Sequence, residues 1–382
     1  MSKLKILIIM GRYLPGYKDG GPVRSIKNLS DYYGDKYDFE ILTLDRDHGD
    51  DCQYEGIKEA NWNDVGKAHV YYVKPGGFKV NIIRRLASDV DIVYLCGCFS
   101  DYALKAMLLK KIGLIKAPVV IAPMGLFSPL EFHRKYVKKK TFTTIINLFG
   151  LVDNLYWSCT SDMEVSDLKR EIRADKSRIY IAEDLPRVVD EADIYKKKEV
   201  NQLKVIWLSR INHHKNLIGS IKMLQKCHDD IELSIYGTNE DSDEWNVCLE
   251  ELNKLPENVK WTYKGVAESE KVVDIFKQYH IFLLQTKGEN FGHAIQEALS
   301  GGCPCVISDL TPWQNLEAYN AGFVLPLGDE SAFLKAIHYY SVMNEKEFND
   351  CVGCAHAYAI SASNARIDNS GYEKMFKAII NN

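Results

Sequence analysis

Short apolar runs alternate along this chain with longer segments in which apolar residues recur every three or four positions. The short runs are typical of buried strands and the longer period is typical of helices. In the first half, the pattern predicts helices at Val23–Tyr33, Asp101–Ile112 and Ser161–Glu171, and strands at Lys5–Met10, Phe39–Leu44, Val70–Val73, Asp91–Leu95, Val119–Ala122, Asn154–Trp157 and Ile179–Ile181. Ser161 followed by Glu164 fits a capping box.

A polar stretch at residues 184–203 interrupts the alternation and predicts a linker. After it, we expect helices at Leu217–Lys226, Asp243–Leu255, Ser269–Tyr279, Gly292–Ser300 and Ser363–Ile380, and strands at Lys204–Leu208, Glu232–Tyr236, Val259–Tyr263, Ile281–Gln285 and Pro304–Ile307. Strand–helix alternation predicts parallel sheets covered by helices. The sequence therefore predicts an α/β protein with two Rossmann-like, doubly wound domains, at residues 1–186 and 187–363, facing a central cleft where ligands bind.

Composition and charge exclude several other classes. Hydrophobic residues make up 46% and charged residues 26%, as in ordinary globular proteins. The net charge of −4 does not favour a nucleic-acid partner. Residues 1–190 hold 29 Lys and Arg against 25 Asp and Glu, a net +4, so this half is the one that would face an anionic partner. The first apolar run, Ile6–Met10, is too short for a signal peptide or a membrane span, which predicts a cytoplasmic protein.

The ten cysteines are too few for a disulfide scaffold in a chain of 382 residues. Cys96, Cys303 and Cys305 lie in or beside apolar runs, where cysteine packs as a small hydrophobic residue. A zinc or redox role for the pair Cys351 and Cys354, which has C-x-x-C spacing, is the less favoured alternative.

The segment from Gly288 to Ser308 combines a loop after a strand with a helix start. Gly292 lets a ligand approach the backbone, and the free N–H groups of such a turn suit an anionic or polyhydroxylated ligand. Carboxylates at Glu289 and Glu297 accept hydrogen bonds from sugar or ribose hydroxyls. The alternative is that Glu289 caps the helix and Glu297 is solvated. Asn290, Phe291 and His293 complete this candidate donor-binding loop.

A second candidate site follows the strand that ends at Leu208. Arg210 and Lys215 stand in the turn before the next helix. A guanidinium fork and a compact ammonium group both stabilise negative charge on a departing diphosphate. Surface cations at a strand end are the alternative.

A third, weaker signal is Gly20-Gly21, which opens the first helix and can lay backbone N–H groups against a phosphate. The alternative is a simple turn, and Arg24 is then a surface residue. The segment Asp45-Arg46-Asp47 is interpreted as a loop, and the histidines His213, His214 and His293 lack metal-ligand spacing. We therefore expect no metal and no other cofactor.

Residues 134–149 place Arg134, Lys135 and Lys138–Lys140 next to the apolar positions Phe142, Ile145, Ile146, Leu148 and Phe149. Such a segment could rest on an anionic membrane surface. The favoured alternative is a solvated helix start with an apolar stripe facing the core.

The spacing of Glu289 and Glu297 resembles the E-x7-E signature of retaining GT-B glycosyltransferases of family 4, the glycosyl transferases group 1. Asn290-Phe291-Gly292 resembles the usual G-F-G, and Gly301, Gly302 and Pro304 resemble the following G-x-P element. Residues 309–313 are similar to bacterial polysaccharide-assembly members. The family often has His where Cys98 and Met124 stand, so no general base is predicted.

The resemblance implies retaining transfer of a sugar from a nucleotide diphosphate sugar, with UDP as first guess, to a saccharide or lipid-linked saccharide in surface polysaccharide synthesis. It implies that Arg210 and Lys215 hold the diphosphate, Glu289 the sugar and Glu297 the ribose, while Gly20 and Gly21 close over the phosphates. It also implies that residues 364–382 pack on the first domain, which is the acceptor side. Peripheral contact with the inner face of the membrane would go through 134–149. Two rivals are a nucleotide-sugar epimerase of GT-B fold and a catalytically silent nucleotide-sugar-binding partner.

Overall fold

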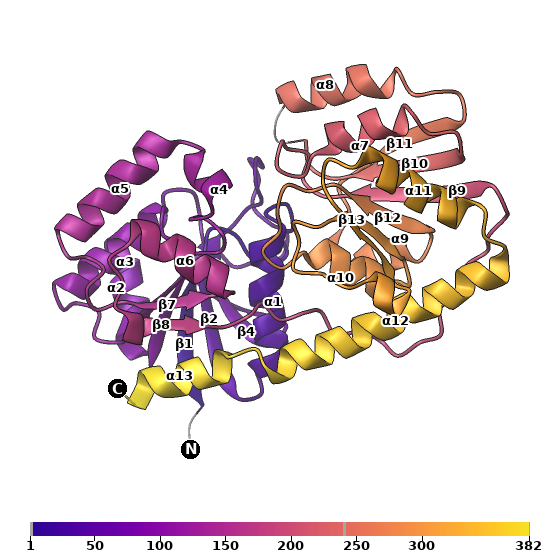
Figure 1. Cartoon of the computed structure of the whole chain (residues 1–382). Coiled ribbons are helices and arrows are strands. Elements are labelled where there is room, and N and C mark those ends of the chain that lie inside the picture. The colour runs from indigo at the N-terminus through magenta and orange to yellow at the C-terminus, as the bar shows by residue number, and fades with distance from the viewer. Residues whose placement is uncertain (1–2, 240–241, 382) are drawn as a thin grey trace. The chain divides into compact units, whose positions relative to one another are not determined.

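The computed structural model describes residues 3–239 and 242–381. The chain divides into two compact units (Figure 1). Unit 1 comprises Met1–Leu185 and Arg366–Asn382, and unit 2 comprises Pro186–Ala365. Each unit is a parallel sheet covered by helices, which confirms the predicted α/β class.

The sheet of unit 1 has the strand order β3-β4-β2-β1-β5-β6-β7-β8. Its strands are β1 Leu4–Ile9, β2 Tyr37–Leu44, β3 Trp62–Val65, β4 Ala68–Val73, β5 Ile92–Cys96, β6 Val119–Ala122, β7 Tyr156–Cys159 and β8 Ile179–Ile181. All neighbours run parallel except the pair β3 and β4, which is antiparallel. The carboxyl ends of seven strands therefore share one edge.

Successive residues of β1 point to opposite faces of this sheet. Ile6 and Ile8 pack with α1 Gly21–Tyr33 and α13 Tyr372–Asn381. Leu7 and Ile9 pack with the other face, which is covered by α2 Val80–Leu86, α3 Asp101–Lys111, α5 Tyr136–Leu148 and α6 Asp162–Glu171. The short helix α4 Pro129–His133 precedes α5. A strand buried on both faces explains the continuous apolar run at the start of the sequence.

The sheet of unit 2 has the order β11-β10-β9-β12-β13-β14, and all of its pairs are parallel. Its strands are β9 Gln202–Leu208, β10 Asp230–Tyr236, β11 Val259–Gly265, β12 Ile281–Leu284, β13 Cys305–Ser308 and β14 Gly322–Leu325. Its helices are α7 Leu217–Leu224, α8 Ser242–Leu252, α9 Val272–Phe276, α10 His293–Ser300, α11 Glu330–Ser341 and α12 Glu345–Asp368. Strands β9 and β12 are neighbours in the sheet although they are not consecutive in the chain. From β9 the chain adds strands toward one edge of the sheet, and from β12 it adds them toward the other edge.

The polar linker is held tightly on unit 2. Its backbone is irregular up to residue 199, and β9 begins at Gln202, two residues before the predicted strand. Lys196 is buried, and its Nζ donates to the carbonyl oxygens of Phe276 at 3.0 Å and Tyr279 at 2.7 Å. Desolvation lowers the pKa of Lys196 to about 8. Lys198 is buried as well, and its Nζ donates to the carbonyl of Ser341.

Two local predictions, the last helix and the capping box at Ser161, are only partly confirmed. Ser363–Ile380 is not one helix, because α12 ends at Asp368 and α13 begins at Tyr372. Gly371 between them has φ +80°, and a Cβ there would meet the carbonyl oxygen of Ile181 at 2.2 Å.

The capping box at α6 is only half formed. Ser161 accepts from the backbone N–H of Glu164 at 3.2 Å, as a cap should. The carboxylate of Glu164 instead accepts from the backbone N–H of Thr160 at 2.7 Å and of Gly125 at 2.5 Å.

All ten cysteines are free thiols, and eight of them are buried. Among the helices that the structure describes, none is both long enough and apolar enough to cross a bilayer.

His280 ties the linker to β9 and generates a prediction about pH. It is 5% exposed, its Nδ1 accepts from the N–H of Lys204 at 2.9 Å, and its Nε2 lies 2.9 Å from the carbonyl of Lys197. Burial lowers its pKa from 6.5 to about 4. The unfolded chain therefore binds this proton more tightly than the folded chain does. The contribution of neutral His280 to the free energy of unfolding is fully present above pH 6.5 and is lost as pH falls toward 4.

Between pH 7.5 and pH 5.0 we expect His280 to account for a loss of about 2 kcal/mol in the free energy of unfolding. Urea unfolding at the two pH values measures it. His280→Gln keeps one donor and one acceptor but does not titrate, so its loss should be smaller by that amount. Equal losses in wild type and variant would contradict the assignment.

Candidate functional site

The loops after β9 and β12 lie side by side at the carboxyl edge of the unit 2 sheet. The N–H of Lys287 donates to the carbonyl of His214 at 2.9 Å, and the side-chain amide of Asn216 donates to the carbonyl of Gln285 at 2.9 Å. These bonds join the two segments that carried the first and second sequence signals. Ligands of open parallel sheets bind beyond this edge.

Lys215 and Glu289 form an ion pair across the two loops. The Nζ of Lys215 is 2.5 Å from Oε1 of Glu289, and the side chains are 13% and 11% exposed. The backbone N–H of Lys215 also donates to Oδ1 of Asn212 at 3.1 Å. Because the pair is mostly shielded from water, its electrostatic interaction is stronger than that of a surface pair. The structure therefore brings together Lys215, which is predicted to bind the diphosphate, and Glu289, which is predicted to bind the sugar.

The turn before α10 is fixed by a buried tryptophan. Gly292 is the N-cap of α10 with φ +78°, and a Cβ there would meet Trp313 at 3.2 Å. Nε1 of Trp313 donates to the carbonyl of Phe291 at 2.6 Å, and the ring of Phe291 packs against that of His293. The first turn of α10 itself holds no acidic residue, so no carboxylate within that turn neutralises the partial positive charge of its N–H groups. The sequence placed Trp313 in the family resemblance but gave it no role.

Both structural alternatives for the glutamates are contradicted. Glu289 does not cap α10, because its N-cap is Gly292 and makes no side-chain cap bond. Glu297 is not solvated, since it is 3% exposed. It stands four residues after His293, which is 8% exposed, so the two lie on the same face of α10.

Arg210 and Asn290 are the exposed members of the predicted set. Arg210 follows β9 by two residues, at the same edge as Lys215. Within the described residues, no ion pair involves Arg210. Next to it, Gly237 allows a close approach of backbones, because a Cβ at this position would meet the carbonyl oxygen of Ser209 at 1.8 Å. Sequence reasoning missed Gly237, since an isolated glycine after a strand also fits an ordinary turn.

In unit 1 the Gly20-Gly21 turn opens α1, with Gly20 at φ +65° and space around its Cα. Asp47 holds the preceding loop. Its Oδ2 accepts from the N–H groups of Tyr17 at 2.8 Å and Lys18 at 3.2 Å, and the residue is 4% exposed. The predicted loop at Asp45–Asp47 thus supports the glycine turn, a role that the sequence did not reveal. That Gly20 and Gly21 contact donor phosphates stays a prediction.

Three side chains near the segment after β6 could be considered as proton acceptors. Cys98 is buried, and burial raises the pKa of its thiol far above the ordinary range. Nδ1 of His133 lies 2.6 Å from the carbonyl of Pro129, within its own helix α4. The carboxylate of Glu164 accepts from the backbone N–H of Gly125 at 2.5 Å. The general base stays unassigned.

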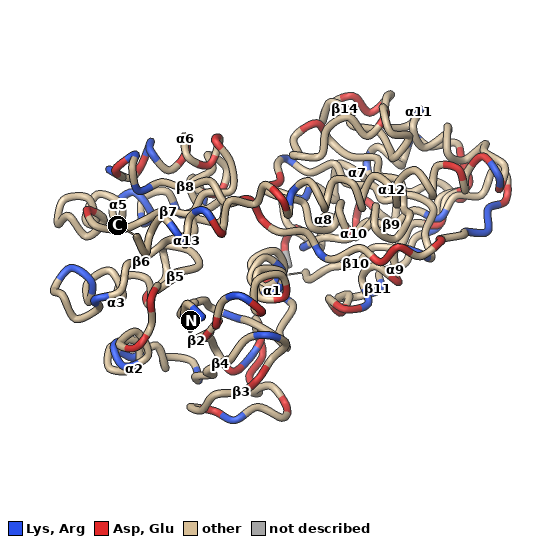
Figure 2. The backbone as a smooth tube through the Cα atoms, turned by 90° about the horizontal axis from the view of Figure 1, so that it is seen from below, with Lys and Arg blue, Asp and Glu red and all other residues tan. Residues whose placement is uncertain are grey.

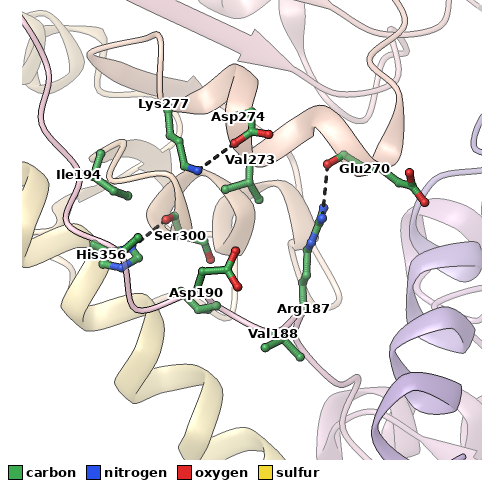
Figure 3. Close-up of a pocket in the computed structure, with 12 residues that line it drawn as sticks. Arg187, Val188, Asp190, Ile194, Glu270, Val273, Asp274, Lys277, Ser300 and His356 are labelled. Atoms are coloured by element: carbon green, nitrogen blue, oxygen red, sulfur yellow. Dashed lines mark hydrogen bonds and ion pairs between the residues drawn. The ribbon is translucent and has the colours of Figure 1, made fainter.

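A small cavity of about 90 Å³ lies elsewhere in unit 2, beside the last residue of α10 (Figure 3). Arg187 donates to the carbonyls of Ser269 and Glu270 there, Lys277 pairs with Asp274 at 2.8 Å, and Nδ1 of His356 lies 2.8 Å from the carbonyl of Ser300. Ligand pockets usually occupy about 300–1,000 Å³. The cavity is too small for a nucleotide sugar and is separate from the Lys215–Glu289 pair.

Unit 2 matches a known protein family. Residues 189–349 match the family described as Glycosyl transferases group 1. This range contains both loops, the ion pair and α10. No curated protein matches the chain. Residues 189–349 are thus similar to a glycosyl transferases group 1 domain, and the chain is a transferase enzyme.

Solved glycosyltransferase structures share the fold of the whole chain. A glycosyltransferase from Rickettsia africae has a TM-score of 0.66 at 14% identity, with 100% of each chain covered. Alr3699/HepE from Anabaena, in complex with UDP and glucose, has 0.64 at 14%, covering 96% of this chain and 98% of its own. A mutant of S. aureus TarM, in complex with UDP and other ligands, has 0.65 at 11%, covering 99% and 100%. These similarities confirm the GT-B fold.

The hydrogen bond that fixes the Phe291–Gly292 turn can be tested with a matched pair of tryptophans. Trp313 and Trp207 are both fully buried, but among the described residues Nε1 of Trp207 has no partner. We expect Trp313→Phe to lower the free energy of unfolding by about 1 kcal/mol more than Trp207→Phe. Urea unfolding of both variants measures the difference, and equal losses would show that the bond does not hold the turn.

Proposed function

We propose that this protein transfers a sugar from a UDP-sugar to a saccharide or lipid-linked saccharide acceptor, with retention at the anomeric carbon, in surface polysaccharide synthesis. Transfer of a sugar from a nucleotide sugar is the activity that the family match and the glycosyltransferase neighbours support. The UDP in the Anabaena and S. aureus structures supports the choice of nucleotide.

The observation that carries the proposal is the Lys215–Glu289 pair at the carboxyl edge of β9 and β12. A cation and a carboxylate held at one ligand-binding edge suit the two ends of a nucleotide sugar. The diphosphate needs positive charge, and the sugar hydroxyls need acceptors.

On this proposal, Lys215 and Arg210 bind the diphosphate. A phosphate oxygen that approaches Lys215 competes with Glu289 for its ammonium group, so donor binding frees the carboxylate for the sugar. Arg210, exposed at the same edge, adds a planar fork that matches a diphosphate. Both cations stabilise the negative charge that grows on the departing diphosphate.

Glu289 then accepts hydrogen bonds from the sugar hydroxyls, and the backbone at Phe291 and Gly292 faces the same group. Glu297, buried in α10, accepts from the ribose hydroxyls. Asn290 and His293 line the donor from the two sides of the turn. These residues lie on one loop and on the helix that follows it, so they can contact the same donor molecule.

Transfer breaks the bond between the anomeric carbon and the diphosphate oxygen and forms a bond to the acceptor oxygen on the same face. The departing phosphate oxygen takes the proton of the acceptor hydroxyl. This route needs no side-chain base, which agrees with the buried Cys98 and with His133 bonded inside α4. No metal enters the scheme, because Lys215 and Arg210 supply the positive charge.

The acceptor is assigned to unit 1, with Gly20 and Gly21 facing the donor phosphates. A cytoplasmic enzyme in peripheral contact with the inner face of the membrane, through residues 134–149, belongs to the same proposal. A lipid-linked acceptor would be presented at that surface.

Two rivals make different predictions. An epimerase of GT-B fold would convert the donor with no acceptor present and would need acid and base groups near the sugar. A silent nucleotide-sugar-binding partner would bind donor without transfer. Both a silent partner and a transferase would need Lys215 and Glu289 to bind the donor, so formation of a sugar product from donor and acceptor is the result that separates them.

Donor binding is tested first by thermal unfolding with UDP, GDP, ADP and dTDP, with and without EDTA. We expect UDP alone to stabilise the protein, by about 2.7 kcal/mol at roughly 100 times its dissociation constant. EDTA should not change the shift. Arg210→Ala and Glu297→Ala should abolish it, because they remove the diphosphate and ribose contacts.

Lys226→Ala is the matched control. Lys226 lies in unit 2, is 64% exposed and pairs with Glu330, so its removal should leave the UDP shift intact. Stabilisation by another nucleotide would change the donor but keep the site. No stabilisation by any nucleotide, or an undiminished shift in Arg210→Ala, would contradict the site itself.

The stereochemistry is tested by NMR of the sugar product formed from a UDP-sugar and an acceptor. We expect the new bond to keep the anomeric configuration of the donor. An inverted product would refute the retaining scheme, and conversion of the donor without acceptor would favour the epimerase.

A further inference from the structure

The outward side of α5 carries large apolar side chains among the lysines and threonines that a solvated helix would show. Val137 and Leu148 are 75% exposed, Ile145 is 45% exposed, and Phe149 just after the helix is 64% exposed. Of the apolar residues expected to face the core, Ile146 is buried and Phe142 is half-buried. The favoured sequence interpretation, a solvated helix start with an apolar stripe facing the core, is therefore right for Phe142 and Ile146 and wrong for Ile145, Leu148 and Phe149.

The end of α3 extends this surface. Leu108 is 44% and Ile112 is 66% exposed. Nζ of Lys111, between them in sequence, donates to the carbonyl of Gly150 at 2.9 Å, so the end of α3 lies against the end of α5 (Figure 1). We call the exposed apolar residues of the two helices the apolar ridge; they are Leu108, Ile112, Val137, Ile145, Leu148 and Phe149.

A basic hollow of about 430 Å³ lies on one flank of the ridge, between α5 and the end of α6. Lys140 belongs to its lining and lies about 60° around α5 from Val137. Glu171 is the acidic residue of the lining. The hollow is lined by Lys140, Asn147, Lys169, Arg170, Glu171, Ile172, Arg173, Ala174 and Lys176.

The positive charge of the hollow is only partly neutralised. Glu171 pairs with Lys140 at 2.9 Å and with Arg170 at 3.5 Å. Within the part of the chain that the structure describes, no ion pair involves Lys169, Arg173 or Lys176. Figure 2 marks Lys and Arg at the end of α3 and along α5 and α6. Residues 134–149 contain no Asp or Glu.

We propose that the apolar ridge and the basic hollow together bind an anionic lipid bilayer. The ridge enters the boundary between headgroups and acyl chains, and Lys169, Arg173 and Lys176 bind lipid phosphates. Large aliphatic and aromatic side chains beside unpaired cations match a bilayer surface, where negatively charged headgroups cover apolar acyl chains. This inference deepens the membrane contact of the proposed function and is independent of the donor chemistry.

The full-length protein is sedimented with vesicles of phosphatidylcholine alone or of phosphatidylcholine mixed with phosphatidylglycerol. We expect binding to the mixed vesicles, weakened by salt, and no binding to phosphatidylcholine alone. Replacing Lys169, Arg173 and Lys176 by Gln should weaken binding at least roughly tenfold. Leu148→Ser combined with Phe149→Ser should weaken it comparably.

Matched controls lie in unit 2. Replacing Lys254, Lys271 and Lys277 by Gln removes the same formal charge from exposed lysines. Val342→Ser removes a side chain that is 45% exposed. Both controls should bind the mixed vesicles as wild type does. Every variant should keep the UDP-induced thermal shift, so failure of membrane binding and failure of the donor site are distinguishable.

Insertion is read separately with Phe149→Trp, whose added fluorescence should shift to the blue on mixed vesicles. Several results would overturn the proposal. These are no binding to mixed vesicles, equal binding to both kinds, unchanged binding in the basic or apolar variants, or no spectral shift. Binding of soluble poly-glutamate without binding to vesicles would instead identify an acidic protein as the partner.

Discussion

Lys215 and Glu289 are 74 residues apart in the chain and meet because β9 and β12 are neighbours in one parallel sheet. The sheet order of unit 2 crosses over at this point, and the loops that follow the two strands share one edge. Each residue neutralises the charge of the other inside the protein. Without Glu289, Lys215 would be a mostly buried charge with no partner in the protein. Without Lys215, the same would hold for Glu289. The crossover between β9 and β12 therefore determines which charged side chains meet at the ligand-binding edge of unit 2.

The rest of unit 2 holds this arrangement in place. Trp313 fixes the Phe291–Gly292 turn through its indole N–H, and Gly237 lets β10 approach the end of β9. At the far end of α10, Gly302 has φ +56°, and a Cβ there would meet Val352 of α12 at 2.7 Å. Trp313, Gly237 and Gly302 thus act by packing and backbone conformation. Arg210, Lys215, Glu289 and Glu297 are the charged residues that the proposed function assigns to the donor.

The sequence predicted the fold well where strands are continuous apolar runs, because burial on both faces dictates that composition. It missed β3, since Trp62–Val65 is a short edge strand with two polar residues and no apolar run. It also missed β14 Gly322–Leu325, whose apolar run is only four residues long. It predicted a linker from the polarity of residues 184–203 and did not reveal that Lys196 and Lys198 are buried against backbone carbonyls. The Lys215–Glu289 pair and the support of Asp47 were out of reach, because contacts between distant loops depend on strand order and not on local pattern. The exposed side of α5 was missed for the opposite reason, since an apolar stripe predicts a buried face.

The account's central claim is that Lys215 binds the diphosphate while Glu289 binds the sugar. Calorimetric titration of Lys215→Met and Glu289→Gln with UDP and with a UDP-sugar tests it most directly. The account predicts that Lys215→Met weakens the binding of both ligands. Glu289→Gln should weaken the binding of the UDP-sugar and leave UDP binding as tight as in wild type or tighter, because no carboxylate then competes with the phosphate for Lys215. Equal weakening of UDP and UDP-sugar by Glu289→Gln, or normal UDP binding by Lys215→Met, would contradict it.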